Sequence, residues 1–275
     1  MPLHLLRVDL LARCLPAQCP LCRRWPVWRG PAGLCGDCLA RHGRQVPRCA
    51  RCALPLPAPA DGVLAQGEAR GEMGGEVQSR ALPWSALVCG ACMVRPGPLQ
   101  HCVAAVDYAY PWQQLIAQFK YYAAPAWAHG FAQLLLRQSG SAALLHGVDA
   151  IVAVPLAAAR LRQRGYNQAW ELARALAAQT GQAHKLRQGV ALRHGMQAPQ
   201  AGMGRQARWR NLRRAFAVQQ PGRRLQGQHV LLVDDVMTTG ATLWALARVL
   251  QRDAGVAAVS AMVFARTPLP AGLGG

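Results

Sequence analysis

Residues 230–242, with the sequence VLLVDDVMTTGAT, decide the fold of this chain. The apolar run His229–Asp234 predicts a buried parallel strand, because a strand covered on both faces is apolar along its whole length. A loop containing Gly240 follows, and a helix is expected over Thr242–Asp253, where Gly255 ends it. Strand, loop and helix in this order are the repeating unit of a parallel α/β sheet.

The chain from residue 103 onwards shows the same alternation of predicted strands and helices. Short apolar runs bounded by turn residues alternate with stretches of helical periodicity. Strands are expected at Val103–Tyr110, Asp149–Pro155 and Val256–Ala265, and helices at Trp112–Tyr122, Trp127–Gln138 and Asn167–Thr180. The expected fold is therefore α/β, a parallel sheet with helices on both faces, in which ligands sit at the carboxyl ends of the strands.

The loop after the strand is suited to an anion. Backbone amides at a helix N-terminus point towards it, and the helix dipole favours negative charge there. Glycine at 240 lets the backbone approach the anion, and threonine hydroxyls add donors. The expected phosphate-binding residues are Val236, Met237, Thr238, Thr239, Gly240, Ala241 and Thr242. The sequence contains no Gly-Lys-Ser/Thr, which excludes a P-loop.

Asp234 and Asp235 need a different partner, because a carboxylate repels a phosphate. They suit the vicinal hydroxyls of a ribose, as acceptors, or a magnesium ion. A sugar phosphate offers both ends, a phosphate for the loop and a diol for the acids. Asp234 and Asp235 are therefore the candidate catalytic residues. The plainer interpretation is a structural strand end followed by a threonine helix cap.

A second candidate anion site follows the strand expected at Asp149–Pro155. Arginines stand at alternate positions, Arg160, Arg162 and Arg164, before a glycine and a helix that Asn167 is placed to cap. Arginine offers paired donors to phosphate oxygens, but not all three side chains face one ligand. We favour Arg164 with the backbone of Gly165, and Arg160 second. Surface salt bridges or solvated side chains are the plainer interpretation.

The N-terminal third contains four Cys-x2-Cys pairs, which are enough for two tetrahedral zinc sites. The expected metal ligands are Cys19, Cys22, Cys35, Cys38, Cys49, Cys52, Cys89 and Cys92. With four thiolates on each ion no coordination position stays open, so the zincs are structural. Joining the first pair to the second and the third to the fourth gives two ribbons; joining first to third and second to fourth is the alternative. Cys14 and Cys102 are left as ordinary thiols.

Two domains are expected from this organisation. Residues 15–95 form the double zinc ribbon, and residues 103–268 form the α/β domain. Residues 53–88 separate the third and fourth cysteine pairs and are rich in Pro, Gly and Ala. We interpret them as a disordered insertion, since a longer loop costs little entropy once a metal closes it.

The chain has 275 residues and a formal net charge of +19. Residues 150–225 hold thirteen Arg, one Lys and one acid, so this stretch alone carries 14 − 1 = +13. Such a field attracts phosphates, pyrophosphate or nucleic acid, although a solvated arginine-rich surface is the plainer explanation. No segment resembles a membrane span or signal peptide. A reducing cytoplasm is therefore expected, with attachment to the inner membrane only through partners, and metal-bound cysteines rather than disulfides.

Several motifs together resemble the ComF family, also called competence protein F or GntX-like. They are the run RLRQRGYNQ at Arg160–Gln168, the four cysteine pairs, Phe119-Lys120-Tyr121, the acid pair and the segment 197–216. The acid pair with its Thr-Thr-Gly-x-Thr tail also resembles the phosphoribosyl pyrophosphate signature of type I phosphoribosyltransferases. The resemblance covers about residues 15–266, and the insertion at 53–88 departs from it.

This resemblance implies a double zinc ribbon joined to a type I phosphoribosyltransferase-like domain, with magnesium–phosphoribosyl pyrophosphate as ligand. It places a lysine of the site at Lys120. Segment 197–216 matches the position of the loop that closes over the active site in type I enzymes, where Arg205 or Arg208 would reach the pyrophosphate. A plain basic surface helix is the alternative for this segment.

Two hypotheses about function follow. The first is an enzyme of pentosyl transfer, which displaces pyrophosphate from C1 of the ribose in favour of an acceptor that the sequence does not identify. The second is a nucleic-acid-binding or ligand-sensing module in competence and the uptake of single-stranded DNA, supported by the ribbons, the charge and eight Trp. A transcriptional regulator that retains the fold is a weaker third hypothesis, because no helix-turn-helix sequence is present.

Overall fold

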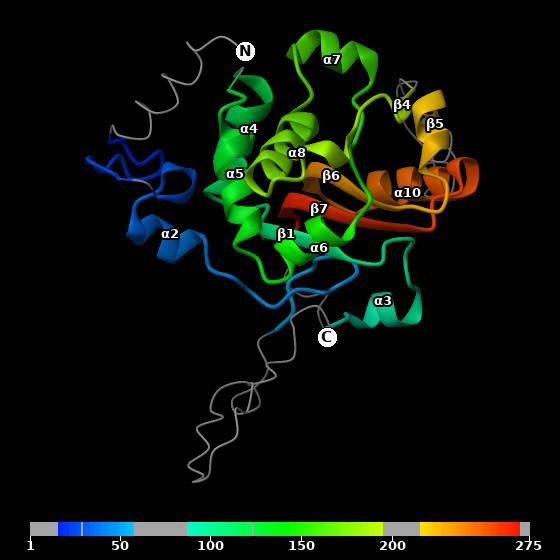
Figure 1. Ribbon diagram of the computed structural model, residues 1–275. Coiled ribbons are helices and arrows are strands. Elements are labelled where there is room, and N and C mark those ends of the chain that lie inside the picture. Colours follow the sequence, from blue (N-terminus) through cyan, green and yellow to red (C-terminus); the bar gives the residue numbers. More distant parts are fainter. Residues whose placement is uncertain (1–15, 29, 58–86, 123, 195–214, 270–275) are drawn as a thin grey trace, which may run out of the picture.

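The computed structural model describes residues 16–28, 30–57, 87–122, 124–194 and 215–269 (Figure 1). The insertion's central part and the segment carrying Arg205 and Arg208 lie outside these residues, as does Cys14. Within the described ranges, no helix combines the length and apolar character needed to cross a bilayer.

A five-stranded parallel sheet forms the centre of the molecule, with strand order β1-β7-β6-β2-β3. Its strands are β1 (Cys102–Asp107), β2 (Ala150–Ala153), β3 (Leu186–Arg187), β6 (His229–Met237) and β7 (Ala258–Arg266). The central strand β6 is apolar through Val233 and buried there, as its sequence predicts. The parallel sheet confirms the predicted α/β class.

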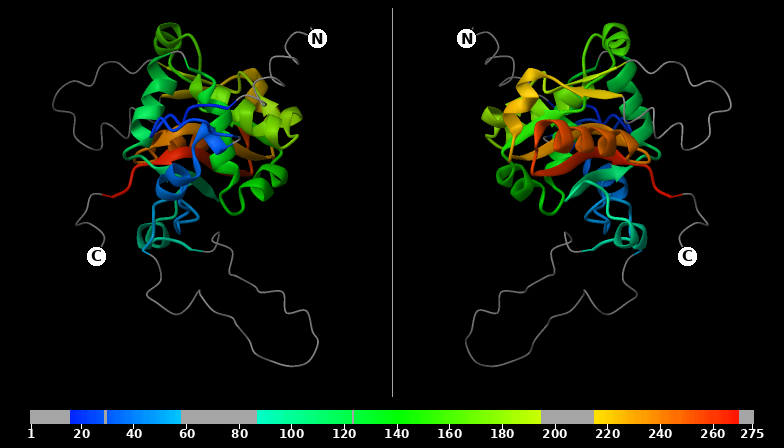
Figure 2. Two further views of the ribbon diagram at one scale, coloured as in Figure 1. Left: turned by 90° about the vertical axis from the view of Figure 1, so that its left-hand side faces the viewer. Right: turned by 90° about the vertical axis from the view of Figure 1, so that its right-hand side faces the viewer.

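Helices cover both faces of this sheet (Figures 1 and 2). On one face lie α4 (Trp112–Tyr121), α5 (Trp127–Leu136) and α8 (Gln168–Gln179), and on the other lies α10 (Ala241–Ala254). Alternate residues of β6 serve the two layers: Leu231 and Val233 join the core under α5 and α8, whereas Val230 and Leu232 join the core under α10. Every predicted helix of this domain is therefore present, within two residues at each end.

The structure adds elements that the sequence pattern does not predict. They are α6 (Ser141–Gly147), α7 (Ala158–Arg164), β3, a two-stranded antiparallel sheet of β4 (Ala191–Arg193) and β5 (Phe216–Val218), and the 3-10 turns η3 (Ala183–Lys185) and η4 (Gln220–Leu225). The alternating arginines thus lie on a short helix and not on an extended loop. Strand β6 also continues past Asp234 to Met237, because Val236 and Met237 still pair with β7.

The cysteine-rich region packs onto the α/β unit at two places. Its first half contains the 3-10 turn η1 (Pro31–Gly33) and helix α2 (Gly36–His42), and its second half contains α3 (Gly90–Val94). Ala32 meets α5, where a Cβ at Gly130 would lie 2.5 Å from its Cα. The second half instead joins the core shared by α10 and the sheet. The boundaries of the two predicted domains remain a proposal, since the ribbons and sheet share both cores.

Candidate functional site

The candidate site lies at the carboxyl end of β6, where the strand passes into α10. Asp234 and Asp235 are consecutive residues of β6, and their carboxylates lie close enough for a side-chain hydrogen bond between them. Asp235 is buried beside Lys120 of α4, whereas Asp234 is partly exposed. The backbone N–H of Asp235 donates to Oδ1 of Asp234 at 2.9 Å, which holds that carboxylate in place.

Lys120, on α4, is the charge partner of Asp235. Its Nζ lies 2.9 Å from Oδ2, and the two side chains are 19% and 5% exposed. Among the described residues Oδ2 accepts no hydrogen bond of good geometry, so the ion pair is its main compensation. The structure therefore brings Lys120 to the acid pair, 115 residues away in sequence.

Asp234 lies in an environment that disfavours its charge. Burial, and next the negative charge of Asp235, raise the pKa of Asp234 well above its usual range. The positive charges of Lys120 and of Arg193, on β4, act on the same carboxylate. Arg193 is itself half-buried beside Asp234 and Arg160, and burial lowers its pKa. Sequence analysis missed Arg193, which carries no distinguishing local pattern.

We expect Asp234→Asn to stabilise the ligand-free protein at neutral pH. With a raised folded pKa, the folded state binds protons more tightly than the unfolded state, whose carboxyl titrates near 3.8. Wild-type stability therefore falls as pH rises from about this value through the raised pKa, and asparagine removes this fall. Urea unfolding without magnesium or phosphate measures the effect. Variant and wild type should have equal free energies of unfolding at pH 3.5, and the variant should have the larger one at pH 7. A variant less stable than wild type at pH 7 would contradict this.

The loop after β6 has the geometry of an anion site. Gly240 is buried in the left-handed conformation, with φ 83°, and an added Cβ would lie 2.5 Å from Cε of Met237. Thr238 and Thr239 are exposed, so their hydroxyls face solvent at the N-terminus of α10. Oγ1 of Thr239 accepts from the N–H of Ala241 at 3.4 Å. Glycine is thus required by the turn itself, and the threonines remain available to a ligand.

The arginines of α7 lie beside this site to different extents. Arg160 and Arg162 are exposed. The Arg164 guanidinium lies 5.1 Å from the centre of the Tyr121 ring, and Gly165 ends the helix with φ 79°. The positive charge of Arg160 acts on Arg193, on which the charge of Asp234 also acts. Asn167 caps α8, since its Oδ1 accepts from the N–H of Ala169 at 3.0 Å, as the sequence predicts.

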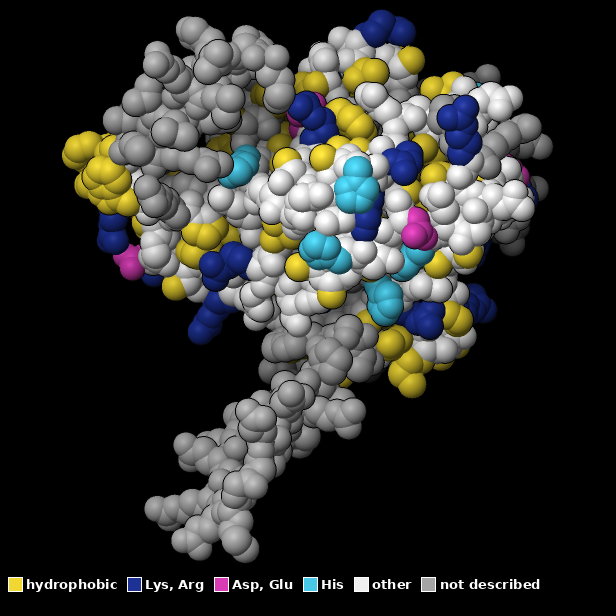
Figure 3. Space-filling view, in the orientation of Figure 1, with side chains coloured by type: hydrophobic (Ala, Val, Ile, Leu, Met, Phe, Trp, Pro, Cys, Tyr) yellow, Lys and Arg dark blue, Asp and Glu magenta, His cyan; other side chains and the backbone are white. Residues whose placement is uncertain are grey.

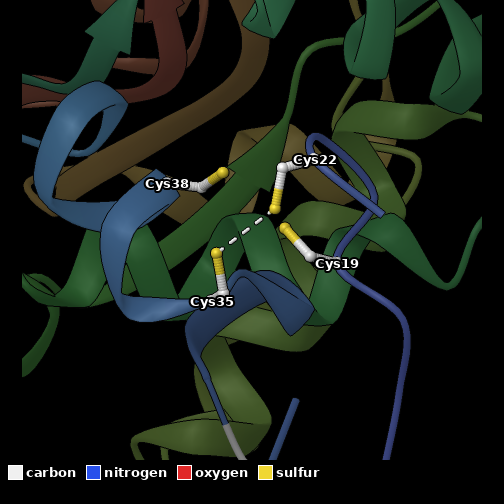
Figure 4. Close-up of side chains that lie close together, drawn as sticks. All are labelled: Cys19, Cys22, Cys35 and Cys38. Carbon is white, nitrogen blue, oxygen red and sulfur yellow. Dashed lines mark hydrogen bonds between the residues drawn. The ribbon is translucent and has the colours of Figure 1, made fainter. Parts of the chain in front are cut away.

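The cysteine-rich region contributes two groups of four cysteines. Within each group the sulfurs all lie within 4.8 Å of one another. Zinc with Zn–S bonds of about 2.3 Å requires four sulfurs at comparable spacing, so both groups fit zinc. The first cluster is Cys19, Cys22, Cys35 and Cys38, whose sulfurs turn towards one centre in Figure 4. The second cluster is Cys49, Cys52, Cys89 and Cys92. The predicted grouping is confirmed and the alternative pairing is wrong.

In each cluster the surroundings favour one thiolate, Cys49 or Cys19, whereas they raise the pKa of Cys38, Cys52 and Cys92. The pKa of Cys49 falls to about 4, first because the Cys52 thiol donates to it and then because backbone N–H groups of Cys89 and Arg51 do. Burial opposes ionisation of Cys19, yet backbone N–H groups led by that of Cys22 lower its pKa to about 6. Backbone amides of the Cys-x2-Cys turns therefore stabilise the charged form that a metal requires.

Basic side chains are spread singly over the face drawn in Figure 3, with few acidic ones between them. They do not gather into one patch on this face. The positive charge on this face is therefore spread out rather than concentrated at one point.

The parallel sheet and the two four-cysteine clusters define an α/β protein with a double zinc ribbon, the architecture that the resemblance to type I phosphoribosyltransferases implies. No protein-family model matches the sequence. The chain is 32% identical to DNA utilization protein YhgH of Salmonella typhimurium, over 92% of its own length and 98% of that protein. The protein of that name in Escherichia coli K12 is also 32% identical, over the same shares.

Competence protein F of Haemophilus influenzae is 29% identical over 66% of the chain and 78% of that protein. The chain therefore belongs to the ComF family, which includes DNA utilization protein YhgH and competence protein F.

Proposed function

We propose that this protein binds magnesium–phosphoribosyl pyrophosphate at the carboxyl end of β6, in a role connected with competence and DNA uptake. The observation that carries the proposal is the pairing of two carboxylates with an anion-binding turn one residue beyond the strand. The names of the relatives, DNA utilization protein and competence protein F, support the connection with DNA.

Different residues of the site bind different parts of the ligand. The 5-phosphate binds the amides of the Thr238–Ala241 turn and the threonine hydroxyls, where the α10 dipole favours negative charge. The ribose hydroxyls donate to Asp234 and Asp235. Arg160, Arg164 and Gly165 lie on the element that would hold pyrophosphate. Arg205 and Arg208 are further candidates for pyrophosphate, on the segment outside the described residues.

Magnesium fits the same place. The two carboxylates supply the hard oxygen ligands that this ion prefers, and in the ligand-free protein Oδ2 of Asp235 is paired with Nζ of Lys120 at 2.9 Å. Bound with the substrate, the ion would neutralise charge on the pyrophosphate.

An enzyme built on this site would work by positioning. A nucleophile of the acceptor forms a bond to C1 of the ribose, the bond from C1 to pyrophosphate breaks, and the electron pair leaves with pyrophosphate. The loop and acids hold the ribose in line for this displacement, and cationic side chains stabilise the departing charge. No covalent protein intermediate is needed.

Calorimetric titration with phosphoribosyl pyrophosphate, with and without magnesium, tests the proposal. We expect magnesium-dependent binding that weakens about 100-fold or more in Asp234→Asn/Asp235→Asn, because hydrogen bonds to charged groups contribute about 1.5–3 kcal/mol each. Asp253→Asn is the matched control, since this exposed acid at the end of α10 pairs with Arg252, away from the loop. A folded, zinc-loaded protein that binds no phosphoribosyl pyrophosphate would refute the proposal.

One observation favours a second function, the binding of single-stranded nucleic acid. Tyr110, Tyr121 and Tyr122 are 70%, 67% and 75% exposed, and Arg164 stacks over Tyr121. Exposed aromatic rings beside cations are suited to stacking bases and contacting phosphates. The same double variant separates the two functions. Salt-sensitive binding of a single-stranded oligonucleotide that survives the acid substitutions would belong to this surface and not to the phosphate loop.

A further inference from the structure

Arg266 is a buried arginine at the end of β7, and its side chain is held by main-chain carbonyls. It is 6% exposed. Nε donates to the carbonyl of Cys52 at 2.9 Å, and Nη1 donates to those of Met237 at 3.2 Å, of Thr267 at 2.6 Å and of Thr238. One guanidinium therefore joins a turn of the second cluster to the first residues of the phosphate loop.

Two further contacts join the same regions. The thiol of Cys102, which belongs to neither cluster, donates to Sδ of Met237 at 3.7 Å. Gly97, in the segment from the second cluster to β1, lies so close to Trp244 of α10 that an added Cβ would be 2.8 Å from the indole. Trp244 in turn lies 3.4 Å from the Cβ position of Gly240. The loop is thus braced at both ends, by Arg266 before Gly240 and by Trp244 after it.

Arg48 makes a parallel connection at the same edge of the sheet. Its Nη1 donates to the Ala53 carbonyl at 3.2 Å and to Oδ1 of Asp107 at 2.8 Å. Asp107 ends β1 and is the register partner of Arg266. Both arginines therefore fasten the Cys49–Ala53 turn to the carboxyl ends of the strands, where the phosphate loop begins.

Within the part of the chain that the structure describes, the first cluster makes no such contact with the phosphate loop. Its contacts run to the outer helical layer, where the N–H of Ala32 donates to Oε1 of Gln133 on α5 at 3.0 Å. The first-cluster cysteines share their core with Phe131 and Leu135 of α5 and not with Met237. The two clusters thus differ in what they support, although their ligand sets are identical.

We propose that the second cluster, through Arg266, sets the conformation of the phosphate loop, so that zinc at this cluster and an anion at the loop stabilise each other. Arg266 is a positioning residue in this arrangement. Only the effect of a bound anion rests on the proposed function, because the contact between the second cluster and the loop exists without ligand. Thermodynamic linkage requires the effect to run in both directions.

Hydrogen exchange of the amides of residues 237–242, in the zinc-loaded full chain without ligand, tests whether Arg266 sets the conformation of the loop. We expect exchange to accelerate about tenfold or more in Arg266→Met, which removes the charged donors from the loop carbonyls. Arg266→Lys keeps the charge but not the planar set of guanidinium donors, so its loop should exchange at a rate between those of wild type and Arg266→Met. Gly97→Ala should also loosen the loop while every zinc ligand is retained. Unchanged loop exchange in folded Arg266→Met and Gly97→Ala would overturn the proposal.

Zinc release to a chromogenic chelator tests the reverse direction. Arg266→Met should speed release of one of two zincs, and ribose 5-phosphate should slow the same phase in wild type. Cys22→Ser is the control, because loss of the first cluster should leave loop exchange unchanged. If ribose 5-phosphate has no effect but Arg266→Met still alters both loop and zinc, the proposed ligand is wrong and the coupling stands. If neither readout responds to Arg266→Met, the coupling is wrong.

Discussion

Replacing Cys52 by serine is expected to leave one zinc per chain in place of two and to lower the free energy of unfolding by on the order of 5 kcal/mol. Cys52 is 5% exposed and belongs to the same core as Val230, Leu232 and Val263 of the sheet. Loss of one ligand leaves thiolates buried without the ion that compensates their charge. The second cluster is therefore part of the main core, and a metal bound there is expected to stabilise the whole α/β unit.

Metal analysis of the purified protein and urea unfolding monitored by circular dichroism measure this effect. Cys102→Ala is the matched control, because Cys102 is a buried thiol outside both clusters and burial raises its pKa to about 12. It should retain two zincs and lose only the packing of one small side chain. Two zincs per chain in Cys52→Ser, or equal instability in Cys102→Ala, would contradict the assignment of the second cluster as a stabilising metal site.

Local patterns suffice to predict most of the sheet and the candidate site. Apolar runs mark β1, β2, β6 and β7 because each strand is covered on both faces, and Gly255 ends α10 in the left-handed conformation that glycine tolerates. The spacing of the cysteine pairs indicates two sites of four thiolates, but it leaves two groupings open, and only the positions of the sulfurs decide between them. These features depend on residues close together in the chain.

Features decided by distant contacts are not predictable in this way. The end of β6 is polar in sequence, yet pairing with β7 extends the strand past the two aspartates to Met237. The contact of Lys120 with Asp235 is suggested by the family resemblance and not by any local pattern. Arg193 and Arg266 resemble the many other arginines of this chain, and only the fold places one beside Asp234 and the other under the phosphate loop.

Lys120→Met is expected to destabilise the protein by about 3–5 kcal/mol, the usual cost of removing one partner of a buried ion pair. The substitution keeps the apolar stem and deletes the charge that lies 2.9 Å from Oδ2 of Asp235. The remaining carboxylate is 5% exposed, and the Asp234 carboxyl group lies beside it. Urea unfolding at pH 7 measures the loss.

A double-mutant cycle separates this charge effect from lost packing. Asp235→Asn removes the unpaired charge, so Lys120→Met/Asp235→Asn should recover most of the stability that Lys120→Met loses. Lys185→Met is the matched control, since the only other lysine of the chain donates to the carbonyls of Leu145 and His146 at the end of α6 and has no buried carboxylate to leave behind. It should cost about 1 kcal/mol or less.

Recovery in the double variant has a consequence for function. If the pair contributes little to stability once both charges are gone, the chain retains a buried lysine and aspartate at a cost that an apolar pair avoids. The benefit is then in binding, because Lys120 holds the Asp235 carboxylate in place before a ribose hydroxyl or magnesium arrives. A double variant as unstable as Lys120→Met would mean that the lysine stem acts by packing alone, and this role for Lys120 would be wrong.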